Sequence, residues 1–126
     1  KDNLSISFTN NIVIYYEGVL FQGPWEKMQI NLDNNLYWKT NGPVEFKGDD
    51  LATWRKNGYD KKSLIMDPIF RNPFLGDFSF KSKKAAKKIG FKPFDYSTYG
   101  VYGSQKWKEK SNLPKETLEA FDKLYE

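Results

Sequence analysis

The stretch ISFTNNIVI, residues 6–14, recurs 24 residues later as INLDNNLYW, residues 30–38. Apolar residues occupy the same alternate positions in both copies, and an Asn-Asn pair stands at the centre of each. A second match, offset by 25 residues, places VLFQG (19–23) on VEFKG (44–48). Short strands that recur at a fixed spacing are typical of stacked repeat units. We therefore predict that equivalent strands pair in parallel and that the asparagines stack and adopt left-handed backbone.

Each copy holds three short alternating segments separated by Asn or Gly turns. This spacing favours an all-β fold, the right-handed single-stranded parallel β-helix, over a sandwich of longer hairpin strands. The alternation predicts the interior residues of the third segments, which are Val19, Phe21, Val44 and Phe46. It leaves four neighbours facing outward, which are Leu20, Gln22, Glu45 and Lys47.

After residue 48 the repeat ends, and short inserted helices are expected near 50–57 and 82–89. Asp50 suits the cap of the first helix better than one half of a catalytic carboxylate pair with Asp49. Segments 63–66 and 77–80 are expected to form strands of one more irregular coil. We predict β-helix coils over residues 1–103, followed at 104–126 by a linker and a helix that caps the C-terminal end.

Composition limits the chemistry, because the chain has no Cys and no His among its 126 residues. A thiol nucleophile is excluded, and so are the commonest general base and zinc ligand. No apolar run is long enough for a membrane span, so no membrane partner is expected. Residues 81–92 carry six lysines and no acidic residue. Their spacing favours an amphipathic helix over a polyanion-binding patch, and nucleic acid is not expected as a partner.

The sequence DLATWRKNGYDKKSLIMDPIFRNPFLGDFSFKSKKAAKKIGFKPFD, residues 50–95, resembles the C-terminal end of bacterial parallel β-helix proteins of the pectin-lyase-like superfamily. The resemblance rests on a Gly-x-Asp-x-x-Ser turn that starts at Gly58, on Asp67-Pro68 with Phe70, on residues 76–78, and on a tail that starts at Gly90. With the upstream repeat it covers about residues 6–103.

The resemblance implies a parent enzyme that degrades polysaccharide as a lyase or glycoside hydrolase and is secreted, periplasmic or on the cell surface. This chain would be its non-catalytic C-terminal part, with upstream coils of the same parent as partner and with dimerisation through an exposed coil edge as an alternative. No cofactor and no metal site is expected here, and calcium is left to the parent. The catalytic residues are not identified by the sequence.

The candidate sugar-contact residues lie on or beside the third segments and are Gln22, Glu45, Lys47, Trp25 and Tyr16. An ordinary solvated sheet face explains the same residues, and the tryptophans could equally pack under loops. Three hypotheses stay open: the enzyme's C-terminal part, a carbohydrate-binding or adhesive β-helix protein without catalysis, and a binder of nucleic acid or anionic surfaces. The last is disfavoured because the lysines lack interleaved aromatic residues.

Overall fold

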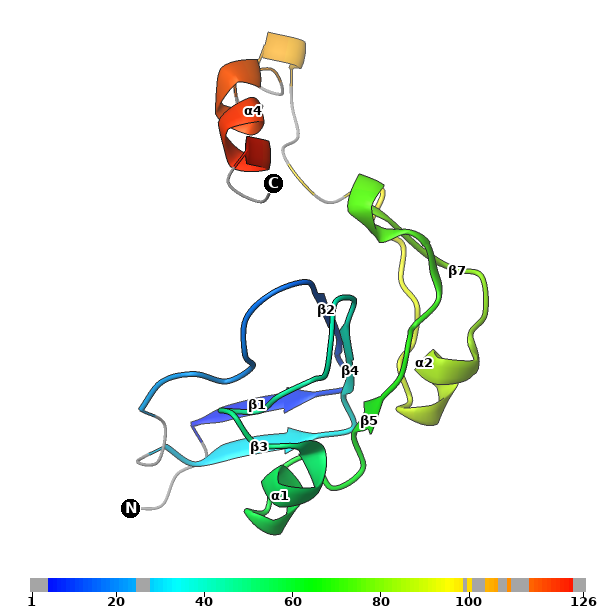
Figure 1. Ribbon diagram of the computed structural model, residues 1–126. Helices are drawn as coiled ribbons and strands as arrows, with labels where there is room; N and C mark the ends of the chain where they lie inside the picture. Colours follow the sequence, from blue (N-terminus) through cyan, green and yellow to red (C-terminus); the bar gives the residue numbers. More distant parts are fainter. Residues whose placement is uncertain are drawn as a thin grey trace. The chain divides into compact units, whose positions relative to one another are not determined.

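A computed structural model shows that the two copies of the repeat pair as parallel strands. The four strands are β1 (Ile6–Thr9), β2 (Ile12–Tyr15), β3 (Ile30–Asp33) and β4 (Leu36–Lys39). Ile6 lies opposite Ile30 in the β1/β3 pair, and Ile12 lies opposite Leu36 in the β2/β4 pair. Figure 1 shows β1 and β3 side by side with their arrows in the same direction. The register predicted from the offset of 24 is therefore confirmed.

The structure describes residues 5–24, 28–98, 100, 104–106, 109 and 114–123. The chain forms two units, Lys1–Pro93 and Phe94–Glu126. The strands of the described residues all lie in the first unit. The second contains helix α4 (Lys115–Lys123), which confirms a C-terminal helix. Its role as a cap stays a prediction.

The third segment pairs differently from the prediction. Leu20, not Phe21, is the residue that bridges to Phe46, in a single parallel bridge. Phe21 has a left-handed backbone with φ of 59°, so the strand ends at Leu20 and the chain turns there. The predicted alternation is consequently wrong at Leu20, because both Leu20 and Phe21 pack against the core.

Helix α1 (Leu51–Lys56) follows the repeat, as predicted. The backbone N–H of Thr53 donates to the Asp50 carboxylate over 2.8 Å, and this bond lowers the pKa of Asp50. Asp50 is therefore the helix cap, as expected. Beyond α1, strand β5 (Leu64–Ile65) joins the far edge of β4, also in parallel.

The next segment reverses direction and does not form a further coil. Strand β6 (Phe70–Asn72), the short 3-10 helix η1 (Pro73–Leu75) and strand β7 (Asp77–Phe80) make an antiparallel hairpin. Pro73 opens the turn, and Gly76 closes it with φ of 78°. The strand predicted at 77–80 is present, but it pairs with β6 and not with the parallel sheet.

The prediction of an all-β right-handed parallel β-helix is therefore wrong. The described residues form a mixed α/β structure with small sheets in the orders β1-β3, β2-β4-β5 and β6-β7, the last antiparallel. The repeat correctly predicted the local strand pairing, but two repeats did not determine what the rest of the chain builds.

The sheet β2-β4-β5 is covered on both faces, which explains the mixed architecture. Its inner face contributes Tyr37 to an aromatic core with Phe46 and Trp54. Its outer face contributes Leu36, which packs against helix α2 (Lys84–Lys88) and the following Ile89. The predicted apolar side of the lysine helix is confirmed because Ala85, Ala86 and Ile89 are all buried.

Candidate functional site

The predicted sugar-contact residues do not gather at one described site. Gln22, Lys47 and Tyr16 are exposed, and Glu45 is half-buried, whereas Trp25 lies outside the described residues. Gln22 lines an apolar groove that neither Glu45 nor Lys47 lines. Their role in sugar binding stays a prediction.

The asparagines form a polar ladder between the strand pairs. The backbone N–H of Asn11 donates to Oδ1 of Asn35 over 2.9 Å, and the N–H of Asn35 donates to Oγ of Ser63 over 2.8 Å. The Asn11 amide nitrogen also donates to Asn35 Oδ1, over 3.2 Å. Asn10 and Asn34 take the left-handed backbone that the turns need, with φ of 59° and 54°. The predicted stacking of the asparagines is confirmed.

Asp60 closes the lower end of this ladder. Its side chain is fully buried and accepts hydrogen bonds from four other side chains. The donors are Ser63 Oγ at 2.6 Å, Tyr37 Oη at 3.0 Å and Asn35 Nδ2 at 3.4 Å to Oδ1, and Trp54 Nε1 at 2.8 Å to Oδ2. Buried carboxylates are costly unless hydrogen-bonded, so these donors make the site tolerable.

The network also fixes helix α1 against the strands. The Arg55 guanidinium donates to the backbone carbonyls of Asp60 and Ser63, over 3.2 and 2.5 Å. Burial raises the pKa of Tyr37, and the charge of Asp60 and the hydrogen bond to it raise that pKa further.

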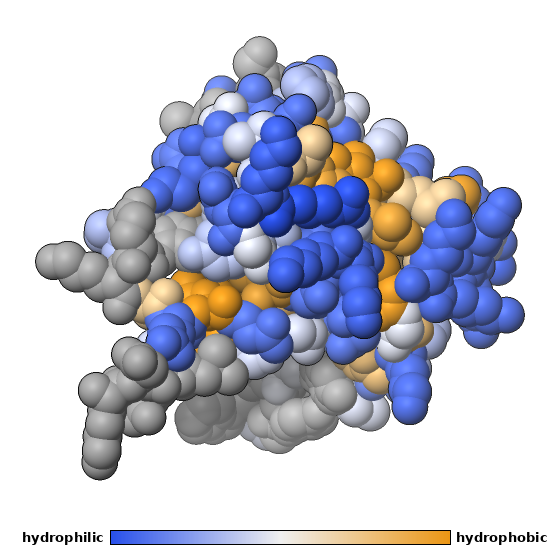
Figure 2. Space-filling model, turned by 90° about the horizontal axis from the view of Figure 1, so that it is seen from below, coloured by the Kyte–Doolittle hydropathy of each residue, from blue (hydrophilic) through white to orange (hydrophobic). Residues whose placement is uncertain are grey.

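Figure 2 views the chain from below, the side on which α1 lies in Figure 1, and shows hydrophilic residues over much of that face.

The upper end of the ladder is open. The N–H groups of Leu36 and Thr40 donate to the carbonyls of Asn11 and Tyr15. Because backbone groups alternate along a strand, those of Ile12 and Ile14 point to the other edge of β2. No described residue pairs with that edge, nor with the corresponding edge of β1.

Two features accompany the open edge. Asn11 Oδ1 accepts no hydrogen bond from any described residue, although the equivalent acceptors below it, Asn35 Oδ1 and Ser63 Oγ, each accept one from a backbone N–H. A groove of about 450 Å³ lies beside β1. It is lined mainly by apolar side chains, namely Ile6, Phe8, Phe21, Pro24, Met28, Ile30 and Leu32, with Gln22 and Gly23.

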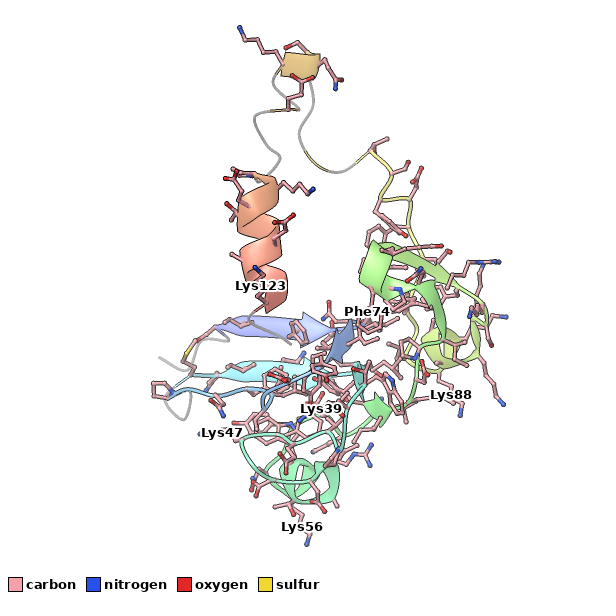
Figure 3. All side chains as sticks on the ribbon, turned by 45° about the horizontal axis from the view of Figure 1, so that its top comes forward. Lys39, Lys47, Lys56, Phe74, Lys88 and Lys123 are labelled. Carbon is pink, nitrogen blue, oxygen red and sulfur yellow. The ribbon has the colours of Figure 1, made fainter. Side chains whose placement is uncertain are left out.

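A basic surface lies elsewhere on the same unit. All six lysines of residues 81–92 are exposed, and none forms a salt bridge with another described residue. They are Lys81, Lys83, Lys84, Lys87, Lys88 and Lys92. Figure 3 shows Lys88 well apart from Lys47, so the predicted contact residue Lys47 does not belong to this surface.

Over the ranges that the structure describes, no cluster of three or more acidic side chains could hold a metal ion. The described helices are also too short or too polar to cross a membrane.

Sequence reasoning missed the part that Asp60 and Tyr37 play. The sequence marks Asp60 only as the third residue of the turn that starts at Gly58. The signal that could have found it is Tyr37 of β4, two residues after Asn35, which places a hydroxyl inside an otherwise apolar face.

Comparison with protein-family models, with curated proteins and with solved structures found no match.

Proposed function

We propose that this chain is a non-catalytic binding module that extends its sheets with a strand from a polypeptide partner. The observation that carries the proposal is the edge of β2, where the backbone groups of Ile12 and Ile14 point away from β4. The edge of β1 lies free of described residues in the same direction. Unpaired edges of this kind are templates for strand addition, in which main-chain hydrogen bonds provide affinity.

The polar groups of the ladder support a structural rather than a catalytic role. Asp60 is the one fully buried carboxylate among the described residues, and four side-chain donors already occupy it. A group so enclosed holds α1, β4 and the turn together and has no path to a substrate. The affinity of the module would therefore reside at its open edge.

The test uses a peptide that copies residues 5–16 and a pair of matched variants at Ile14. Ile14→Pro removes an N–H that points to the open edge, and edge strands tolerate proline at such a position. Ile14→Ala also shortens the side chain but keeps this N–H. We expect the peptide to slow hydrogen exchange of Ile12 and Ile14 in the unaltered chain, and to bind Ile14→Ala but not Ile14→Pro. Equal binding by both variants would contradict strand addition at this edge.

A second candidate is binding of acidic polysaccharide, which the exposed lysines of residues 81–92 favour. Lysines without acidic neighbours attract polyanions, and carboxylated sugars fit the polysaccharide function that the sequence resemblance implies. A parent that degrades polysaccharide, and export from the cytoplasm, stay predictions. This candidate concerns a different surface from the strand edge.

The second candidate is tested by titrating polygalacturonate and a neutral galactan at two salt concentrations. We expect salt-sensitive binding of the acidic polymer alone, weakened about tenfold in Lys84→Gln/Lys87→Gln/Lys88→Gln. The matched control is Lys56→Gln/Lys61→Gln/Lys62→Gln, which removes three exposed lysines outside residues 81–92. Tighter binding of duplex DNA than of polygalacturonate would contradict a polysaccharide preference.

A further inference from the structure

We infer that the partner strand belongs to a strand–Asn–strand segment that joins the open edges of β1 and β2 in parallel register. This inference rests on the proposed strand addition and specifies the chemistry of its partner. It comes from three features of the edge that an added strand without a turn and without apolar side chains would not contact. They are the side-chain oxygen of Asn11, the left-handed turns and the apolar groove.

The ladder determines what must lie above Asn11. At each described level, a backbone N–H just after the turn donates to a side-chain oxygen of the level below, first from Asn11 to Asn35 and then from Asn35 to Ser63. Asn11 Oδ1 is the acceptor that continues this series, and no described group donates to it. A partner in parallel register would bring the equivalent N–H to this oxygen.

The turn restricts the partner's sequence. Asn10 and Asn34 occupy equivalent positions, and both have positive φ. Asn10 also donates to the carbonyl of Ile89 over 2.6 Å. A segment that follows the same path would need Asn or Gly at its first turn residue, because other residues are strained in left-handed backbone.

The groove restricts the side chains of the partner's first strand. Ile6 and Phe8 of β1 line it together with Ile30 and Leu32 of β3, and Ile6 keeps 47% of its surface exposed. Apolar residues at alternate positions of an added strand would continue this row and fill the groove. Polar residues there would bury unpaired groups.

A second copy of this chain does not meet these requirements. The far edges of β3 and β4 are occupied, since the Leu32 carbonyl accepts the Asp60 N–H and β4 pairs with β5. A second copy could offer only its own β1/β2 edge. If the β1/β2 edges of two copies pair with their interior faces on the same side, their strands run antiparallel. In that arrangement the second copy brings no N–H to Asn11 Oδ1.

The experiment uses the full chain, labelled with ¹⁵N, and the peptide that copies residues 5–16. A nitroxide on the peptide's N-terminus should broaden amide signals near Ile6 and spare those near Tyr15. N-methylation of the peptide's second asparagine removes the N–H destined for Asn11 Oδ1 and should weaken binding about 3- to 10-fold. N-methylation of the isoleucine that follows is the matched control and should change little, because that N–H points away from the chain.

The outcomes separate this inference from the proposed function. Broadening near Tyr15, or equal effects of the two methylations, would overturn parallel pairing on Asn11 while strand addition stands. Formation of a symmetric dimer through β1 and β2 that excludes the peptide would assign the edge to a second copy. Failure of both this peptide and an alternating Thr-Val peptide to bind would overturn strand addition itself.

Discussion

Replacement of Asp60 by asparagine should destabilise the chain strongly, because this residue joins α1 to the strands. Asparagine keeps one oxygen, which can still accept from Ser63 and Tyr37. It places an NH₂ group where Oδ2 now accepts from Trp54 Nε1 over 2.8 Å. Two buried donors would then face each other without an acceptor.

The magnitude follows from the bonds that change. Each buried donor left without a partner costs about 1–3 kcal/mol, and the bonds to Oδ1 also weaken when the acceptor loses its charge. We expect Asp60→Asn to lower the free energy of unfolding by about 3–6 kcal/mol. Because a domain of this size is stable by about 5–15 kcal/mol, the variant should lose a large share of its stability, and it would be near its unfolding midpoint if the chain lies at the low end of that range.

Urea unfolding followed by far-ultraviolet circular dichroism measures this loss. The matched control is Asp67→Asn, because Asp67 is exposed and, among the described residues, accepts only from the N–H of Ile69 in its own turn. We expect the control to change the stability by less than about 0.5 kcal/mol. A loss below about 1 kcal/mol in Asp60→Asn would refute the view that the closed end of the ladder depends on this carboxylate.

Two further predictions concern Tyr37 and Asn34. Burial, with the charge of Asp60 and the bond to it, raises the pKa of Tyr37 above its ordinary value of 10.0. The contribution of Tyr37 to the free energy of unfolding should therefore be fully present below pH 10.0 and fall as the pH rises above it. Tyr37→Phe should remove this part of the fall. An unchanged slope of the free energy of unfolding against pH in Tyr37→Phe would contradict the prediction. Asn34 has φ of 54°, so Asn34→Ala should be less stable than Asn34→Gly by about 1 kcal/mol in urea unfolding, and equal midpoints would show that the turn does not need left-handed backbone.

The strand pairing could be predicted because an internal repeat carries register information. When side chains stack on equivalent side chains 24 residues later, the sequence has apolar residues at the same positions of both copies. Ile6 and Ile30 pair as expected, and so do Ile12 and Leu36. Asp50 was predictable as well, since a cap is a local property of the chain.

The third segment and the overall fold could not be predicted in the same way. Phe21 adopts a left-handed backbone, which is rare for phenylalanine and cannot be predicted from the residue type. Because the chain turns at Phe21, the bridge to Phe46 forms at Leu20. The hairpin through η1 depends on long-range pairing that the Pro73 turn allows but does not require. Two repeats therefore predicted local pairing and not the architecture.

The placement of the candidate site residues could not be predicted for a related reason. Gln22, Glu45 and Lys47 share one outward face only if the alternation is regular, and the chain turns at Phe21, which has a left-handed backbone. Their role in sugar binding stays a prediction. Asp60 was missed because its donors come from distant positions in the sequence, including Asn35 and Tyr37. Only the folded arrangement brings them to one carboxylate.

Hydrogen exchange of four consecutive amides in β2 tests the open edge most directly. The register with β4 predicts that the amides of Val13 and Tyr15 are bonded, whereas those of Ile12 and Ile14 point to the open edge. We predict that Val13 and Tyr15 exchange at least about 100-fold more slowly than Ile12 and Ile14 in the chain alone. Equal protection of all four amides would mean that the edge is already covered, and it would contradict the account.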